Sequence, residues 1–179
     1  MKKLFLSFVL LCAIQASFSQ DKKGKPFFTG SLNLTFAVNE NYQLFQPDDG
    51  ETLLEPTAVL IRAGFGYQFN KRFAASLHAG FDHHWKFRIN TIPTYGTLQY
   101  NITEDMGDTF FVETSYGKLW RPSNKFSDGN YYGAGIGFQI AGEKRWNTII
   151  KLNYHRKSIQ GFRKGYLNSV SIGIGFSFF

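Results

Sequence analysis

The sequence predicts an all-β fold, a closed eight-stranded antiparallel up-and-down transmembrane β-barrel. First, apolar residues alternate with small or polar ones through eight separate segments, as in strands that have two unlike faces. Second, 18% of the residues are aromatic, and 20 of them are Phe, a composition that favours strands. Third, the mature chain has no run of 18 apolar residues, so it could cross lipid only with strands closed into a barrel.

The N-terminal segment has the layout of a secretory signal peptide. Met1-Lys2-Lys3 is basic, residues 4–14 are a short apolar run, and small residues follow at the expected cleavage site. We therefore assign residues 1–19 to a cleaved signal peptide and residues 20–179 to one outer-membrane β-barrel domain. The only cysteine, Cys12, lies in the signal, so we expect no disulfide and no cysteine metal site in the mature chain.

The first four predicted strands span residues 28–38, 57–69, 73–81 and 93–102. The first alternates Leu and Phe with Ser, Asn and Thr, and the second alternates Val, Ile, Phe and Tyr with Arg, Gly and Gln. The third follows after a tight turn, which predicts a hairpin. The fourth alternates less cleanly, and Pro93 suits a strand end better than a strand centre.

The last four predicted strands span residues 109–117, 131–140, 147–156 and 167–179. The fifth alternates Phe, Val and Tyr with Glu, Ser and Gly, the sixth sets Ala, Ile and Phe against Gly and Gln, and the seventh sets Ile, Leu and Tyr against Lys, Asn and His. The eighth is the clearest, because every second residue from Val170 to Phe178 is apolar and the residues between are Ser or Gly. We expect the apolar face to contact lipid.

The predicted connectors alternate in length. Residues 39–56, 82–92, 118–130 and 157–166 are long, whereas residues 70–72, 103–108 and 141–146 are shorter. Bacterial barrels have long outer loops and short periplasmic turns. Aromatic residues should form two rims, one containing Tyr67, Phe69, Phe73, Phe110 and Trp146 and the other containing Phe81, Trp85, Tyr116, Trp120 and Tyr154.

On these features the chain resembles the small eight-stranded outer-membrane barrels of the outer-membrane protein A/X type. The signal peptide, the hairpin over residues 65–73 and the aromatic terminal strand carry the resemblance. It implies location in the cell outer membrane and insertion by the barrel-assembly machinery. One departure is that the apolar residues of the last strand fall at even positions counted back from Phe179. The alternative is a soluble lipocalin-like barrel, whose apolar face points inward.

Charged residues on the second face are expected to fill the barrel interior. A charge in a narrow lumen must be paired, and eight strands leave room only for side chains, so we expect a plugging network and no conduction. The predicted members of this lumen network are Arg62, His78, Glu113, Lys151 and His155. A metal site built from His78, Asp82, His84 and His155 is disfavoured, because the side chains on the third strand are spread over about 13 to 20 Å. We expect no metal and no cofactor.

The segment His155-Arg156-Lys157-Ser158 is similar to the His-x-Ser motif of outer-membrane lipid A deacylases, which implies His155 as base and Ser158 as nucleophile. The spacing is three instead of two, which puts the two side chains on opposite faces if the strand continues. In addition, no Asp or Glu follows Glu143 to orient the histidine. Catalysis therefore remains an alternative interpretation, and we predict that the protein is not an enzyme.

The long loops are predicted to be basic and aromatic, apart from an acidic first loop. Basic side chains there would face the phosphates of lipopolysaccharide. The residues assigned to this contact are Lys86, Arg88, Arg121, Lys125, Arg163 and Lys164. The expected partners are outer-membrane lipid, lipopolysaccharide, the barrel-assembly machinery during insertion and possible envelope protein complexes, with no nucleic acid.

The function predicted from the sequence is that of a non-enzymatic integral outer-membrane protein with a structural or interaction role, including that of an accessory subunit of an envelope complex. A lipid A deacylase and a surface adhesin acting through its loops are the alternatives. The fold alone does not separate these roles.

Overall fold

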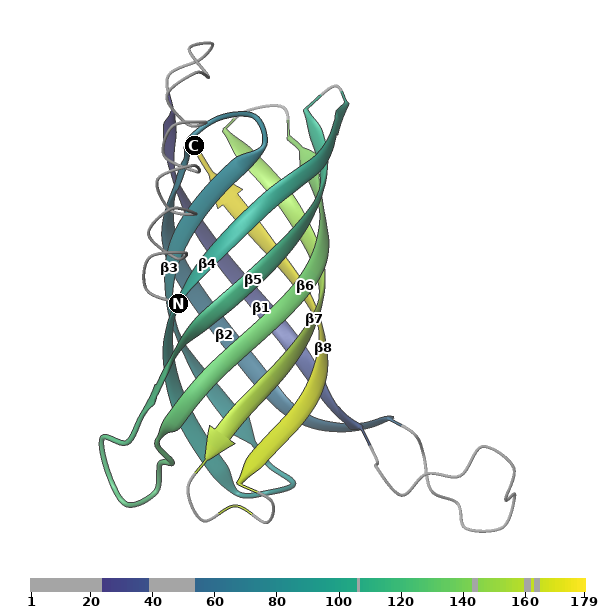
Figure 1. Cartoon of the computed structure of the whole chain (residues 1–179). Coiled ribbons are helices and arrows are strands. Elements are labelled where there is room, and N and C mark those ends of the chain that lie inside the picture. Colours follow the sequence, from purple (N-terminus) through teal and green to yellow (C-terminus); the bar gives the residue numbers. More distant parts are fainter. Residues whose placement is uncertain (1–23, 39–53, 106, 143–144, 160–161, 163–164) are drawn as a thin grey trace, which may run out of the picture.

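The computed structural model describes residues 24–38, 54–105, 107–142, 145–159, 162 and 165–179. They form a closed barrel in which consecutive strands pair antiparallel and the last strand pairs with the first (Figure 1). This confirms the predicted fold class. The strands are β1 (Lys25–Val38), β2 (Leu54–Gln68), β3 (Phe73–His84), β4 (Ile89–Asp105), β5 (Asp108–Trp120), β6 (Gly129–Ala141), β7 (Trp146–Ile159) and β8 (Tyr166–Phe178).

The two ends of the barrel differ. β1 begins and β8 ends at one end, together with the connectors at residues 69–72 and 142–145, and we call this the terminal end (Figure 1). The opposite, loop end holds the connectors at residues 85–88, 121–128 and 160–165. The predicted signal peptide, residues 1–19, and most of the predicted acidic first loop lie outside the described residues.

Several strands run further toward the loop end than predicted. β3 continues through Asp82 to His84, β5 continues to Trp120, and β7 continues through Lys157 to Ile159. The predicted connectors 82–92, 118–130 and 157–166 were therefore too long, and residues 85–88 form only a short turn. Polar side chains usually indicate a loop. Here the polar side chains of these strand ends point into the lumen and bind other side chains there, so the strand pairing continues past them.

The weak alternation of the fourth predicted strand has two structural causes. Pro93 lies inside β4, opposite Leu119 of β5, so its placement at a strand end was wrong. Because Pro93 has no N–H, it cannot donate a ladder hydrogen bond. The pairing of β3 with β4 is interrupted at this point: it stops at Ala79↔Thr94 and resumes at Asp82↔Thr91. Further along, the register shifts between Asn101 and Thr103, which breaks the two-residue period.

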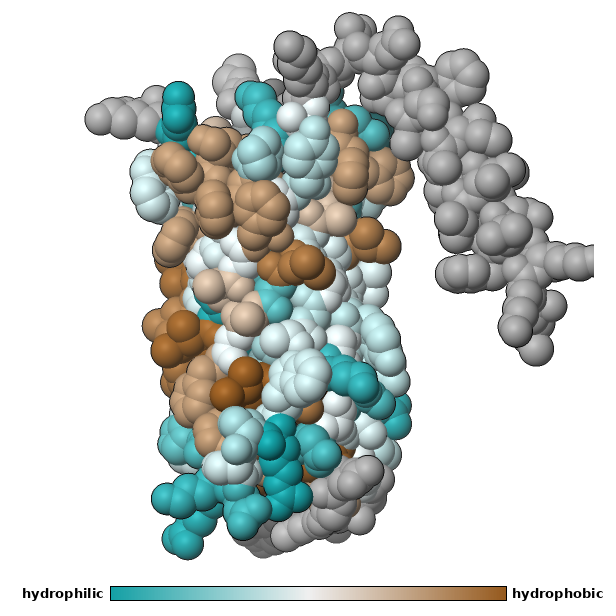
Figure 2. Space-filling model, turned by 90° about the vertical axis from the view of Figure 1, so that its left-hand side faces the viewer, coloured by the Kyte–Doolittle hydropathy of each residue, from teal (hydrophilic) through white to brown (hydrophobic). Residues whose placement is uncertain are grey.

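The outer face of the barrel is apolar. Leu77 is 72% exposed, and Ile172 and Ile174 on the outward face of β8 are more than half exposed. Figure 2 shows apolar side chains over much of the wall and hydrophilic ones gathered toward the loop end. Such a continuous apolar surface is stable in lipid and not in water. Exposed aromatic residues lie in both predicted rims. Those of the terminal-end rim are Tyr67, Phe69, Phe73 and Trp146, and those of the loop-end rim are Phe81, Trp85, Tyr116, Trp120 and Tyr154. Phe110, predicted in the terminal-end rim, is only partly exposed. 

Among the described residues there is no helix long and apolar enough to cross a membrane.

Two glycines allow aromatic rings to fill the terminal end of the lumen. Phe27 lies against Gly66, and Phe111 lies against Gly137, where a Cβ atom would collide with each ring. Phe179 packs on Phe27 with ring centroids 5.5 Å apart. The last aromatic residue of the chain is therefore part of the inner packing and does not join the lipid-facing set.

Candidate functional site in the barrel lumen

Three layers of side chains cross the lumen and leave only small cavities between them. The two interior cavities measure about 20 Å³ and about 30 Å³. A cavity that size holds about one or two water molecules. Within the described residues, the lumen is therefore a packed polar core in which these two cavities lie between layers of side chains.

The layer nearest the loop end is centred on Asp82, whose side chain is fully buried. One carboxylate oxygen accepts a hydrogen bond from Arg62, and the other accepts hydrogen bonds from Lys157 Nζ at 2.5 Å and from the Thr91 hydroxyl at 3.1 Å. Lys157 Nζ also donates to His84 Nε2 at 2.6 Å. One carboxylate is thus shared by two buried cations from β2 and β7, which ties both strands to β3.

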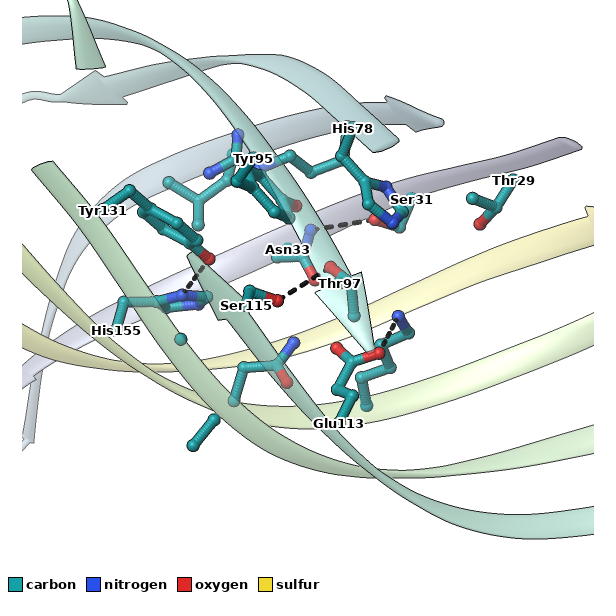
Figure 3. Close-up of a pocket in the computed structure, with 16 residues that line it drawn as sticks. Thr29, Ser31, Asn33, His78, Tyr95, Thr97, Glu113, Ser115, Tyr131 and His155 are labelled. Carbon is teal, nitrogen blue, oxygen red and sulfur yellow. Dashed lines mark hydrogen bonds and ion pairs between the residues drawn. The ribbon is translucent and has the colours of Figure 1, made fainter. Parts of the chain in front are cut away.

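The second layer is a row of four aromatic side chains across the barrel (Figure 3). Tyr95 stacks between His78 and Tyr131, with ring centroids 5.0 and 4.5 Å away, and Tyr131 lies 5.6 Å from His155. Hydrogen bonds of 2.6 Å join the Tyr131 hydroxyl to His155 Nδ1 and His155 Nε2 to the Ser171 hydroxyl. This row connects β3, β4, β6, β7 and β8.

The third layer is an ion pair nearer the terminal end. Lys151 Nζ donates to Glu113 Oε2 at 2.8 Å, and the Lys151 ammonium lies 5.6 Å from the centre of the Phe111 ring. Both side chains border the two interior cavities, so they are more accessible than the Asp82 layer.

Tyr131→Phe should reduce the free energy of unfolding by about 1–3 kcal/mol, because it removes the hydroxyl bonded to His155 and leaves a buried ring nitrogen without its partner. Urea titration of the barrel in detergent, followed by the shift of the folded band on a cold gel, measures this change. Tyr132→Phe is the matched control, since Tyr132 is the next residue on β6 and lies on the exposed outer face. Equal stability of the two variants would contradict the assignment.

The structure places all five predicted lumen residues inside the barrel. It brings Glu113 and Lys151 together, and it links His155 to Tyr131, which was not predicted. Arg62 pairs with Asp82, a residue that we had placed in a loop. Lys157 also points inward, which was not predicted. The two-residue alternation could have predicted these inward positions. Asp82 and His84 lie on the same strand face as His78, and Lys157 lies on the same face as His155.

The structure separates the two residues of the deacylase alternative. β7 continues to Ile159, so His155 points inward and Ser158 points outward. His155 is 4% exposed, and the serine bonded to it is the fully buried Ser171. His155 and Ser158 therefore lie on opposite faces of β7 and cannot act together as base and nucleophile.

The histidines are also dispersed. His78 bonds the Ser76 hydroxyl, whereas His84 belongs to the Asp82 layer. In the described part of the chain, no three His, Cys, Asp or Glu side chains gather in a way that could hold a metal ion.

The predicted lipopolysaccharide contacts fall at the loop end. Lys86 and Arg88 are exposed in the β3–β4 turn, and Arg121 and Lys125 are exposed in the β5–β6 loop. Arg163 and Lys164 lie outside the described residues. Lys157, the first residue of the predicted connector 157–166, is fully buried in the lumen, so its placement in a connector was wrong.

Neither a family model nor a curated protein matches this chain. Solved structures do match. Neisserial surface protein A (NspA) is similar with a TM-score of 0.62 at 9% identity, covering 88% of this chain and 99% of that one. The N-terminal barrel domain of Pseudomonas aeruginosa OprF (TM-score 0.48, 15% identity, 87% and 100% covered) and Ail of Yersinia pestis (TM-score 0.45, 13% identity, 88% and 100% covered) also match. The match to NspA shows that the chain shares the fold of small eight-stranded outer-membrane barrels.

Proposed function

We propose that this protein is a non-enzymatic, non-conducting integral protein of the cell outer membrane, acting as a structural or interaction partner in the envelope. The observation that carries the proposal is the packed lumen, in which the Asp82 layer and the aromatic row close the barrel from wall to wall. With the interior closed, only the lipid-facing wall and the two ends remain to contact other molecules. The apolar wall supports residence in lipid, and the terminal strand suits insertion by the barrel-assembly machinery.

The loop end is the better candidate for contact with other molecules. Exposed Arg88, Arg121 and Lys125 form a basic surface there, which suits acidic partners or the anionic lipopolysaccharide leaflet. An accessory role in an envelope complex would use this surface. The adhesin alternative rests on the acidic first loop, most of which lies outside the described residues, so no structural observation favours it.

The purified barrel should show no unitary conductance in planar bilayers, because the interior cavities are separated by packed layers. A paired variant, Tyr95→Ala with Tyr131→Ala, provides the comparison, since it removes the two stacked rings at the centre of the row. Heat-dependent gel migration would verify that both proteins are folded before insertion. Discrete channel openings from the unchanged protein would overturn the non-conducting assignment.

The interaction role predicts a partner in membranes that depends on the basic loop end. Affinity purification in mild detergent should recover an envelope protein with the unchanged barrel, and Arg121→Glu with Lys125→Glu should reduce its recovery at least about tenfold. Lys71→Glu with Arg72→Glu, at exposed positions of the terminal end, is the matched control. A barrel that always purifies alone would argue against an accessory subunit.

A further inference from the structure

The outer wall near the loop end carries two exposed cations at the level of the aromatic rim. Along β5, Lys118 lies between Tyr116 and Trp120, and along β7, Arg156 lies two residues beyond Tyr154. Lys118 and Arg156 are both exposed on the outer face, whereas their neighbours Leu119 and His155 are buried inside. A charge on the lipid side of a barrel is costly in the membrane centre and is tolerated at the interface, where lipid phosphates are found.

The strand register joins these cations into one polar band. Lys118 pairs with Asn130, Asn130 with Ser158, and Ser158 with Tyr166. In the adjacent row, Tyr116 pairs with Tyr132, Tyr132 with Arg156, and Arg156 with Asn168. Arg156 lies two strands away from Lys118 and two residues further along the strand direction. Their Cα atoms are therefore about 12 Å apart. That separation suits two phosphates at opposite ends of a phosphorylated disaccharide.

Each cation borders a hollow in the apolar wall. Lys118 lines a hollow of about 720 Å³ whose floor includes Ala63, Ala79 and Gly96 and whose sides include Tyr116 and Trp120. Trp120 is held there by a 2.5 Å hydrogen bond from its indole N–H to the Thr94 hydroxyl.

Arg156 lines a second hollow of about 490 Å³ with Tyr132, Ala134 and Tyr154. Tyr116 lines the first hollow and Tyr132 the second, and their rings contact each other at a tilt with centroids 5.1 Å apart, so this pair divides the two hollows. Small residues between aromatic walls give room for acyl chains on either side of the pair.

Among the described residues, neither cation is paired with a carboxylate. Arg156 stacks over the Tyr166 ring at 4.2 Å, which orients the guanidinium and leaves its N–H groups for an anion. Within the described residues, the recorded ion pairs join other side chains and include neither Lys118 nor Arg156. The carboxylates of the described barrel core, Asp82 and Glu113, point into the lumen.

From this arrangement we propose that the β5–β8 wall is a binding site for one bisphosphorylated, multiply acylated glycolipid of the outer leaflet. Lys118 binds one phosphate, Arg156 binds the other, and acyl chains occupy the two hollows on either side of the Tyr116–Tyr132 pair. The inference rests on the proposed outer-membrane location. It differs from the predicted lipopolysaccharide contact, because it lies on the barrel wall and not in the loops.

The test is native mass spectrometry of the folded barrel released from detergent after incubation with bisphosphorylated lipid A, monophosphorylated lipid A or phosphatidylglycerol. The unchanged protein should retain the bisphosphorylated lipid best. Lys118→Gln with Arg156→Gln should weaken its binding at least about tenfold, whereas Lys118→Arg with Arg156→Lys should retain most of it. Lys71→Gln with Arg72→Gln, at exposed positions of the terminal end, is the matched control and should bind as the unchanged protein does.

Equal lipid A retention by the Lys118→Gln, Arg156→Gln variant would overturn the site. Equal retention of phosphatidylglycerol and bisphosphorylated lipid A would also overturn it, because the wall would then attract any anionic lipid. Neither outcome affects the proposed function, since the closed lumen is tested separately by conductance. Both substituted side chains are exposed, and heat-dependent gel migration of each variant checks that the barrel is folded.

Discussion

Asp82→Asn is expected to lower the free energy of unfolding by about 3–5 kcal/mol, because it leaves Arg62 and Lys157 as buried cations without a carboxylate. Both cationic side chains are almost completely removed from solvent, at 5% and 0% exposure. Their positive charges would repel each other across the lumen, and the links from β3 to β2 and β7 would weaken. Urea titration in detergent, monitored by the folded band on a cold gel, measures the change.

Two further variants separate the electrostatic cause from simple loss of a side chain. Adding Lys157→Met to Asp82→Asn removes one of the two unpaired cations and should restore part of the lost stability. Glu113→Gln should cost less than Asp82→Asn, because Glu113 has one cationic partner and borders the interior cavities. If Asp82→Asn and Glu113→Gln are equally stable, the Asp82 layer is not the main electrostatic link of the barrel.

Leu77→Arg should destabilise the barrel in lipid by about 2–4 kcal/mol, the cost of placing a cation at the membrane midplane. Leu77 is 72% exposed on the outer wall and lies midway along β3 between the rim residues Phe73 and Phe81. Folding titrations in lipid vesicles of defined thickness provide the measurement.

Phe73→Arg is the matched control on the same face of the same strand. Phe73 lies at the terminal-end rim, where an arginine reaches the interface, so the substitution should cost about 0–1 kcal/mol from its charge. Equal losses for the two arginines would mean that the apolar belt is not centred on Leu77. Unchanged stability of Leu77→Arg would contradict a lipid-facing wall altogether.

The sequence predicted most of the barrel because strand alternation is a local property. In β8, the outward series from Val170 to Phe178 appears in the sequence as an unbroken two-residue period. In β4, the period is broken by Pro93 and by the register shift after Asn101, and the predicted bounds of that strand were too short at both ends. Local patterns identify a strand but do not show where its partners interrupt the ladder.

The polar ends of the strands were harder to predict. Asp82, His84 and Lys157 resemble loop residues in the sequence, because charged side chains usually favour solvent. They continue the strands only because Asp82 from β3 and Lys157 from β7 meet inside the barrel, 75 residues apart in the chain. No local pattern contains that encounter, so the Asp82 layer could not be derived from either segment alone.

By itself the sequence determined that the chain would form eight two-faced strands, since side-chain alternation along a strand needs no knowledge of the neighbouring strands. Only the tertiary structure decided which charges pair in the lumen and which cations share the outer wall. The physical reason is that the strand register brings together residues far apart in the chain: it places Arg62 beside Asp82 and sets Lys118 in one band with Arg156.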